Sequence, residues 1–161
     1  MEKCHNDSKC VKKTLEKILH EQRNVRKKKN DNCEFSCQSP LGELFKPNKN
    51  NTIPFILYCN CEAFKVEGVT TCFDDCSKKE KFVCFLTFIF KIVELKDDCV
   101  VLELLKFKNH NKCVANTKDH ICSPCCQLDC EDVEDLISTC VCITVDISSF
   151  TGIQCLPAVC L

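Results

Sequence analysis

The sequence has few of the residues that nucleotide-binding and hydrolytic sites require. It contains only three glycines in 161 residues, and none of them belongs to a loop that could cradle a phosphate. A Gly-x-Ser-x-Gly motif, which marks the nucleophile of many hydrolases, is also absent. The 22 basic and 23 acidic residues are mixed along the chain, and this balance argues against a dedicated nucleic-acid-binding surface. We therefore expect neither an enzyme nor a nucleic-acid-binding protein.

The chain also lacks a long apolar segment. Its first residues, Met-Glu-Lys-Cys-His, lead into polar sequence, which predicts that no secretory signal is present. The longest nearly uninterrupted apolar run, Phe82–Phe90, is well short of the ~20 residues that a membrane-spanning helix needs. We expect a protein that is made in the cytosol and is not inserted into a membrane.

Cysteine is the residue that the chain has in excess. There are 19 cysteines, an odd number, so that complete internal pairing would still leave one thiol. A chain of this length can bury a core without disulfides, so the cysteines exceed what folding requires. Cytosolic thiols are normally kept reduced. The cysteines therefore either bind metal or meet an oxidant later, without export, as when the cell that made them lyses.

Strict alternation of apolar and polar residues between positions 141 and 147 predicts a β-strand with one apolar face. Cys142 lies on the other face, and strand geometry places Cys140 beside it. The predicted sheet therefore carries thiols on the side that faces away from the core. The apolar face comprises Val141, Ile143, Val145 and Ile147.

The rest of the pattern predicts one mainly-β domain, an antiparallel sheet or sandwich, with an N-terminal amphipathic helix. Apolar residues at helical spacing favour a helix from Lys9 to Arg26, with Ser8 as its N-cap and the polar Gln22 on its apolar face. We divide the chain into residues 1–30, the helix and a basic linker, and residues 31–161, a cysteine-rich β domain.

Several strands and loops follow from composition. A strand is expected from Ile53 to Cys59, and Cys61 shares a strand face with Cys59 if the extended conformation continues. The oily segment Lys81–Leu95 favours one strand buried on both faces, and Cys99–Phe107 favours the return strand of an antiparallel hairpin. Polar loops are expected at residues 31–52, 71–81 and 109–135.

A basic run ends the predicted helix, with Arg23, Arg26 and Lys27 to Lys29 close together. It is either a phosphate-binding patch or a basic helix end that interacts favourably with the helix dipole. No aromatic residues interleave with the charges, which favours the second interpretation.

Three groups of cysteines have the spacing of metal ligands, which makes zinc the alternative cofactor and a zinc-binding module the alternative function. A thioredoxin-like pair, Cys122-Ser-Pro-Cys125, is a third interpretation, although the segment lacks the βαβ context of that motif. The three groups are Cys33 with Cys37, Cys72 with Cys76, and the cluster of His120, Cys122, Cys125, Cys126 and Cys130.

The interpretation that accounts for most cysteines is disulfide cross-linking between copies of the chain. Neighbours two apart on one strand face rarely bond each other, so such thiols more readily reach a second molecule. With no catalytic residue and no cofactor assigned, the candidate cross-linking residues are Cys4, Cys10, Cys33, Cys37, Cys59, Cys61, Cys122, Cys125, Cys126, Cys130, Cys140, Cys142, Cys155 and Cys160.

Several segments, in order between Thr14 and Leu156, resemble the CotY/CotZ/ExsY-type cysteine-rich proteins of the bacterial spore coat and exosporium. The most specific is Cys142-Ile-Thr-Val-Asp-Ile-Ser-Ser-Phe-Thr-Gly-Ile-Gln-Cys-Leu156. The others are LEKILHEQ at 15–22, NTIPF at 51–55, FKIVEL at 90–95 and CVVLELL at 99–105.

The resemblance implies a non-enzymatic morphogenetic protein, made in the mother cell, that assembles with itself and with other spore coat or exosporium proteins. It further implies two-dimensional arrays hardened by disulfides in the spore's outer shell. The family usually has Cys-Phe-Cys where this chain has Ser149-Phe150-Thr151, so cross-links at that turn do not carry over. Cys142 and Cys155 do match the family pattern.

Overall fold

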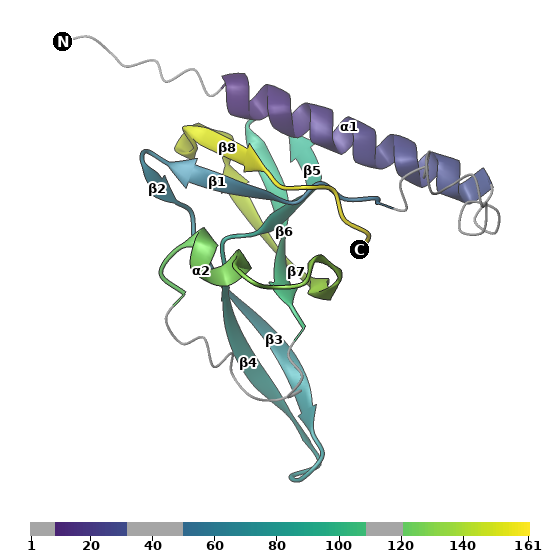
Figure 1. The fold of residues 1–161 in the computed structure, drawn as a ribbon, viewed down its shortest axis with the longest axis vertical. Helices are drawn as coiled ribbons and strands as arrows, with labels where there is room; N and C mark the ends of the chain where they lie inside the picture. The colour runs from purple at the N-terminus through teal and green to yellow at the C-terminus, as the bar shows by residue number, and fades with distance from the viewer. Residues whose placement is uncertain (1–8, 32–49, 109–120) are drawn as a thin grey trace.

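The computed structural model of the chain describes residues 9–31, 50–108 and 121–161, with the backbone alone for residues 26–31. Helix α1 runs from Lys9 to Asp31, five residues beyond the predicted end. It packs against strands β5 (Phe90–Lys96) and β8 (Gly152–Cys155) (Figure 1). The predicted apolar face is confirmed, because Val11, Leu15 and Ile18 are buried in the main core. The predicted N-cap, Ser8, lies outside the described residues.

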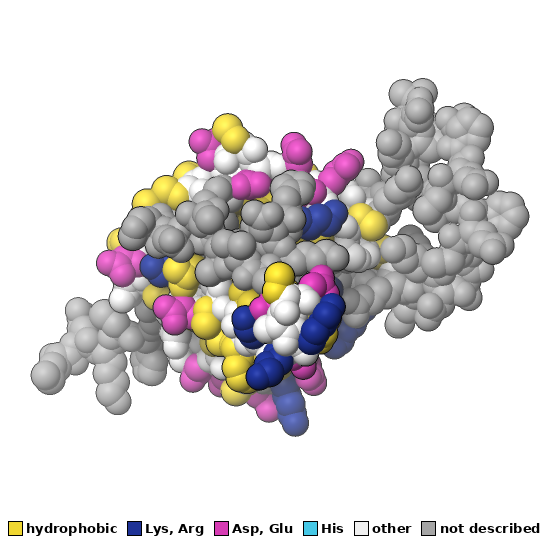
Figure 2. All heavy atoms as spheres, turned by 90° about the horizontal axis from the view of Figure 1, so that it is seen from below, with side chains coloured by type: hydrophobic (Ala, Val, Ile, Leu, Met, Phe, Trp, Pro, Cys, Tyr) yellow, Lys and Arg dark blue, Asp and Glu magenta, His cyan; other side chains and the backbone are white. Residues whose placement is uncertain are grey.

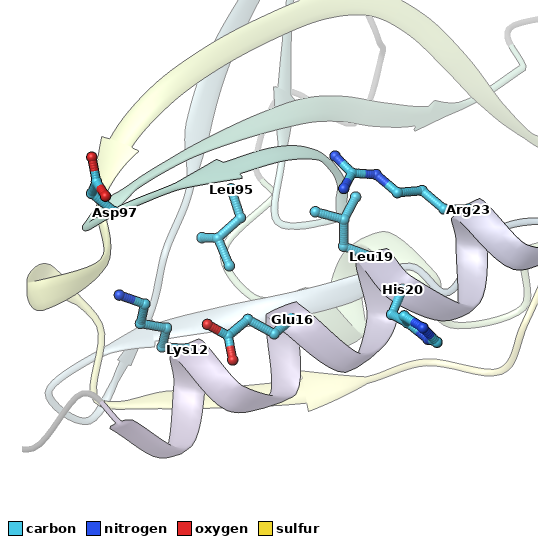
Figure 3. Close-up of a pocket in the computed structure, with 7 residues that line it drawn as sticks. All are labelled: Lys12, Glu16, Leu19, His20, Arg23, Leu95 and Asp97. Atoms are coloured by element: carbon cyan, nitrogen blue, oxygen red, sulfur yellow. The ribbon is translucent and has the colours of Figure 1, made fainter.

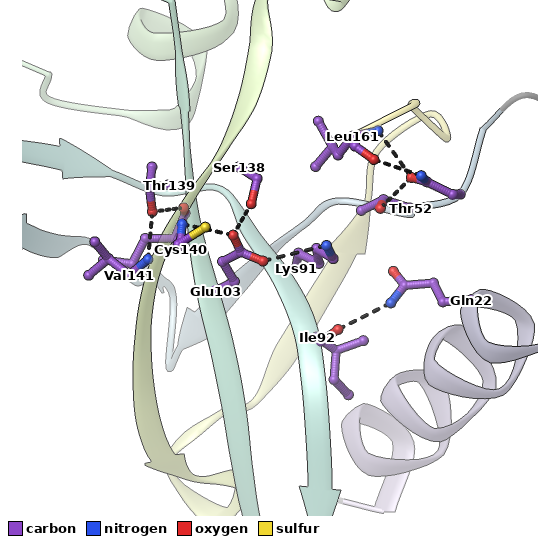
Figure 4. A network of polar contacts seen from close by, with 12 residues as sticks. Gln22, Thr52, Lys91, Ile92, Glu103, Ser138, Thr139, Cys140, Val141 and Leu161 are labelled. Atoms are coloured by element: carbon purple, nitrogen blue, oxygen red, sulfur yellow. Dashed lines mark hydrogen bonds and ion pairs between the residues drawn. The ribbon is translucent and has the colours of Figure 1, made fainter. Parts of the chain in front are cut away.

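The polar residue on the apolar face of α1, Gln22, is also buried. Its Nε2 donates a hydrogen bond to the carbonyl oxygen of Ile92 at 3.1 Å (Figure 4). Its Oε1 accepts one from the backbone N–H of Ile53 at 3.2 Å. A buried amide is tolerated when its donor and its acceptor both find partners. Gln22 therefore ties the helix to the sheet.

Six antiparallel strands form the main sheet, which curves into a half-barrel around the apolar face of α1 (Figure 1). Their order is β2-β1-β5-β6-β7, and β8 pairs with the edge of β1 opposite to the one that contacts β2 and β5. The mainly-β fold with an N-terminal helix is thus confirmed. The strands are β1 (Phe55–Cys59), β2 (Glu62–Ala63), β5 (Phe90–Lys96), β6 (Cys99–Phe107), β7 (Leu136–Asp146) and β8 (Gly152–Cys155).

A separate two-stranded hairpin, β3 (Val66–Asp74) and β4 (Lys79–Thr87), extends away from the main sheet (Figure 1). The prediction of a polar loop at residues 71–81 is wrong, because the strands stay paired as far as Asp74 and Lys79. The end of this hairpin is exposed, so its strands need no apolar alternation, and the sequence signal for a strand is weak there.

The prediction of one strand from Lys81 to Leu95 is also wrong. The segment divides at Phe88 and Ile89 into β4 of the hairpin and β5 of the main sheet. The backbone groups at the break are satisfied from elsewhere: Gln127 Oε1 accepts from the N–H of Phe88 at 2.8 Å, and Thr87 Oγ1 accepts from that of Ile89 at 3.0 Å. The apolar run is therefore continuous because it passes through the buried junction of the two sheets.

The turn between β5 and β6 lies at Asp97 and Asp98, and the prediction of Cys99–Phe107 as the return strand of an antiparallel hairpin is confirmed. In the predicted loop at 109–135, residues 109–120 are outside the described part, and the remainder contains the short helix α2 (Pro124–Leu128) and the 3-10 turn η2 (Val133–Asp135). A second 3-10 turn, η3 (Ile147–Ser149), follows β7.

Two hydrophobic clusters hold the fold together. The larger joins α1 to the concave face of the sheet and contains the fully buried Phe55, Phe90 and Leu102. The smaller surrounds Ile89 and Leu105 where the C-terminal segment returns. No cysteine of the described ranges is buried in either cluster, although the half-buried Cys59 packs against the larger one. The helix and the sheet share one core, and the domain boundary near residue 30 stays a prediction.

Candidate functional site

The cysteines of the described ranges lie almost entirely on the surface. Fourteen of them are free thiols; Cys59 is half-buried, and Cys72 is disulfide-bonded. Cys76, Cys84 and Cys99 were not among the predicted cross-linking residues and are exposed as well. The exposed free thiols are Cys10, Cys61, Cys76, Cys84, Cys99, Cys122, Cys125, Cys126, Cys130, Cys140, Cys142, Cys155 and Cys160.

Three predicted candidates, Cys4, Cys33 and Cys37, lie outside the described residues. Of the three missed thiols, Cys84 belongs to the apolar run that the sequence predicts to be buried on both faces. In the structure its strand belongs to the projecting hairpin, and one face of that hairpin is exposed. The exposure of Cys84 was not predicted because the sequence did not indicate the break at Phe88.

Cys140 and Cys142 lie on the outward side of β7, as the alternation predicts, and both are exposed. The strand is longer than expected and contains a bulge: Cys142 pairs with Glu103 and Ser138 with Leu105, so that three residues of β7 face Leu104 alone. Two extra residues preserve the side on which each following residue points, because side chains alternate with a period of two. The predicted outward orientation of Cys140 and Cys142 therefore holds despite the bulge.

Side chains stabilise the bulge where Cys140 has a φ of 59°. The backbone N–H of Cys140 donates to Glu103 Oε1 at 3.0 Å, and the hydroxyl of Ser138 donates to the same oxygen (Figure 4). The N–H of Val141 donates to Thr139 Oγ1 at 3.1 Å. These bonds replace the ladder bonds that the bulge interrupts, which fixes the position of Cys140.

Glu103 is buried beside a buried lysine, with Lys91 Nζ at 3.4 Å from its Oε2. Burial alone raises the pKa of Glu103, but hydrogen bonds from Ser138 and Cys140 together with the charge of Lys91 lower it overall. Lys91, Glu103 and Cys142 are cross-strand neighbours in one row of β5, β6 and β7. Burial, and next the charge of Glu103, raise the pKa of the Cys142 thiol.

Cys59 and Cys61 were expected to share one strand face only if the extended conformation continued, and it does not continue past Cys59. Strand β1 ends at Cys59, and the chain turns at Asn60, whose φ is 49°, so that Cys59 pairs with Glu62 across the turn. Burial raises the pKa of the Cys59 thiol and, on β8, that of the Cys155 thiol. Both thiols are therefore less readily ionised than a fully solvated cysteine.

The cluster around α2 brings two thiols together, but not the two that the Cys-x-x-Cys spacing predicts. The sulfur of Cys122 lies 3.0 Å from that of Cys126. Ser123 caps the helix by accepting from the N–H of Cys126 at 3.2 Å, and Pro124 occupies the first turn. The thioredoxin-like pairing of Cys122 with Cys125 is therefore replaced by Cys122 with Cys126.

Within the described ranges, no three His, Cys, Asp or Glu side chains are arranged to hold a metal ion. Of the predicted zinc cluster, His120 lies outside those ranges, and the four cysteines from Cys122 to Cys130 are exposed. No helix in the described part of the chain is sufficiently long and apolar to cross a bilayer.

One face of the hairpin, which we call the outer face, carries an exposed apolar patch. It comprises the alternate residues Val69, Thr71 and Phe73 of β3 and Phe82 and Cys84 of β4, with the exposed Glu67 and Glu80 at its margins. Phe82 is 82% exposed, Phe73 55% and Val69 50%. Seen from below, hydrophobic and lysine side chains lie next to one another around the end of the hairpin (Figure 2). Exposed apolar patches are typical of surfaces that contact other molecules.

A shallow pocket of about 390 Å³ lies between α1 and the turn that joins β5 to β6 (Figure 3). It is lined by charges of both signs, with Arg23 at one end and Asp97 at the other, and by the apolar Leu19 and Leu95. Lys12 pairs with the neighbouring Asp98 at 3.3 Å. The mixed charge gives no preference for a phosphate, and the side chains of residues 26–31, which complete the predicted basic run, are not described.

Comparison with known proteins gives a family. The family model described as spore coat protein Z matches residues 1–158. A curated relative, spore coat protein Z of Bacillus subtilis (strain 168), is 27% identical over 151 residues, which cover 92% of this chain and 89% of the relative. No solved structure matches the chain. Because the family model spans nearly the whole sequence, this cysteine-rich chain belongs to the spore coat protein Z family.

Proposed function

We propose that this protein is a structural, non-enzymatic component of the spore coat or exosporium that assembles with itself into a two-dimensional lattice and is hardened by disulfides between neighbours. The family supports the coat role. The proposal also takes the mother-cell cytoplasm as the place of synthesis and other coat proteins as further partners.

The observation that carries the proposal is the placement of sulfur. Thirteen free thiols of the described residues are exposed, and they lie on the helix, both sheets, the turns and the C-terminal segment. A thiol that stabilised the fold of a single molecule would lie near another cysteine or inside the core. Most of these thiols instead face solvent, where a disulfide with a neighbouring copy needs only that the two Cα atoms approach to about 4.4–6.8 Å.

The surface also favours contact between copies. Strand β7 is an edge of the main sheet, and its core-facing residues Val141, Ile143 and Val145 remain partly exposed. An edge strand with free backbone groups is a template for pairing with another chain. Cys140 and Cys142 lie on this edge, so that strand pairing would bring thiols of two copies together.

The test is oxidation of purified, reduced protein, followed by gel electrophoresis without reductant. We expect a ladder of cross-linked species that collapses to the monomer when a reductant is added, and electron microscopy should show sheets in the oxidised sample. Protein alkylated with iodoacetamide before oxidation is the control and should remain monomeric on the gel. A wholly monomeric band from oxidised, unalkylated protein would contradict the proposal.

A further inference from the structure

The thiols of Cys122 and Cys126, which we call the dithiol, are in direct contact. Their sulfurs are 3.0 Å apart, and a disulfide bond is about 2.05 Å long, so bond formation needs a movement of only about 1 Å. Both residues are exposed, so an oxidant in solution can reach them.

The surroundings of the dithiol distinguish its two sulfurs. The hydroxyl of Ser123 donates to the sulfur of Cys126 at 3.2 Å, and the Cys122 thiol lies within hydrogen-bond distance of the same sulfur. The hydrogen bond from Cys122, and next that from Ser123, lower the pKa of Cys126, while its partnership with Cys126 raises the pKa of Cys122. A thiolate, not a thiol, is the nucleophile in disulfide exchange. Cys126, which also receives the hydrogen bond of the Ser123 hydroxyl, is therefore the more readily ionised sulfur of the two.

A buried side chain of the same helix fixes the dithiol to the body of the protein. Gln127 follows Cys126 directly, and its side chain enters the junction of the two sheets. Its Oε1 accepts from the N–H of Phe88 at 2.8 Å, and its Nε2 donates to Thr87 Oγ1 at 2.9 Å. The two sulfurs therefore stay in place without the support of a longer helix.

We propose that Cys126 is the thiol through which this protein first reacts with a low-molecular-weight disulfide, and that Cys122 resolves the product. The Cys126 thiolate attacks one sulfur of the reagent R–S–S–R; the reagent's bond breaks, a mixed disulfide forms, and R–S⁻ leaves. Cys122 then loses its proton to R–S⁻ and attacks the sulfur of Cys126. A second R–S⁻ leaves and takes a proton from water. One dithiol is oxidised, and one reagent disulfide is reduced to two thiols.

The Cys122–Cys126 disulfide could then be attacked by a thiolate of a second copy, giving a disulfide between copies and one free thiol. This last step rests on the proposed function, whereas the formation of the internal disulfide does not. Exposure and a neighbouring resolving cysteine are the features of cysteines that react selectively with oxidants.

The experiment uses the reduced full chain and 5,5′-dithiobis(2-nitrobenzoate), a disulfide reagent, at less than one equivalent and about pH 7. Acid quenching and peptide mapping by mass spectrometry then locate the products. We expect two thionitrobenzoates released per reagent and an internal Cys122–Cys126 disulfide. In the Cys122→Ser variant, one thionitrobenzoate should be released per reagent, and the second should remain bound to Cys126 as a mixed disulfide. Cys126 should react about threefold or more faster than Cys125 and Cys130.

Matched variants keep the test decisive. Cys125→Ser and Cys130→Ser should behave as the unmodified chain, and Ser123→Ala should slow the reaction of Cys126 without changing the far-ultraviolet circular dichroism spectrum.

Equal labelling of all exposed thiols, or an internal disulfide of Cys122 with Cys125 instead, would overturn the inference. If the internal disulfide forms but no ladder appears on the gel, the inference holds and the proposed function fails. If the Cys122→Ser, Cys126→Ser double variant cross-links at the unmodified rate, the dithiol does not initiate cross-linking, although the proposed function stands.

Discussion

Glu103 shows how one buried side chain determines where two thiols lie. Its carboxylate accepts from Cys140 and Ser138 on β7 and faces Lys91 on β5, so it joins three strands. A buried ion pair does not by itself guarantee stability, because the desolvation of both charges opposes their attraction. Removing one partner is costly, however, since the other charge is left buried without compensation.

We therefore expect Glu103→Gln to lower the free energy of unfolding by roughly 3 kcal/mol at neutral pH. The folded-state pKa of Glu103 is lowered, so its contribution is fully present above the unfolded pKa of about 4.3 and is lost as the pH falls through the folded pKa. The difference between the variant and the unmodified chain should accordingly shrink in acid. Denaturant unfolding in the presence of reductant measures both quantities.

Glu94→Gln is the control for that measurement, because Glu94 is an exposed carboxylate on β5. It should change the free energy of unfolding by less than about 0.5 kcal/mol. An equally small effect of Glu103→Gln would show that the buried network contributes nothing net.

The hairpin of β3 and β4 depends on a glycine for its attachment to the body. Gly68 pairs with Phe85, and a Cβ at position 68 would lie 2.3 Å from the Phe85 ring. The ring is buried, and Lys106 Nζ lies 5.2 Å from its centroid. Phe85 thus occupies the space that a side chain at position 68 would need, and so its contact with the core requires glycine there.

Gly68→Ala should destabilise the protein by about 1–3 kcal/mol, the usual cost of overpacking a filled site. Gly152→Ala is a matched control, since its added Cβ would make only an ordinary contact with Tyr58 at 3.6 Å. The free energies of unfolding of both variants under reducing conditions provide the comparison. Equal effects at the two sites would show that the ring moves aside freely.

The whole molecule is a compact body with a projecting hairpin whose outer face carries an apolar patch. Phe82 and Val69 are exposed on either side of Cys84, so that a copy packed on this face would bury both and reach the thiol. A large aromatic side chain gains much from such burial. We take a second copy of the chain as the occupant, in keeping with the proposed lattice.

Phe82→Ser should therefore reduce non-covalent self-association, measured by analytical ultracentrifugation in the presence of reductant. The control is Val93→Ser, which removes an exposed apolar side chain from β5. We expect a lower association constant for Phe82→Ser, a smaller effect for Val93→Ser and unchanged unfolding for both. Association that is insensitive to Phe82 would place the contact elsewhere, for example on the β7 edge.

The sequence predicts those parts of the fold that depend on local periodicity. The apolar face of α1 and the outward thiols of β7 follow from spacings of 3.6 and 2 residues, which the core enforces. The β5–β6 hairpin follows from two β-branched, apolar segments on either side of a polar turn. The division at Phe88 could not be predicted, because Gln127, 39 residues away, satisfies the break. The pairing of Cys122 with Cys126 was missed for a related reason: a Cys-x-x-Cys spacing suggests one partner, and the cap at Ser123 selects another.

No cysteine in the described chain is fully buried, so folding of the subunit and disulfide cross-linking between subunits can occur at different times. The main body can reach its final shape while its surface thiols stay reduced, so covalent joining can wait until the surroundings change. A mild reductant should therefore break the disulfides of such a shell while its subunits stay folded, so that only the non-covalent contacts between subunits remain to be separated.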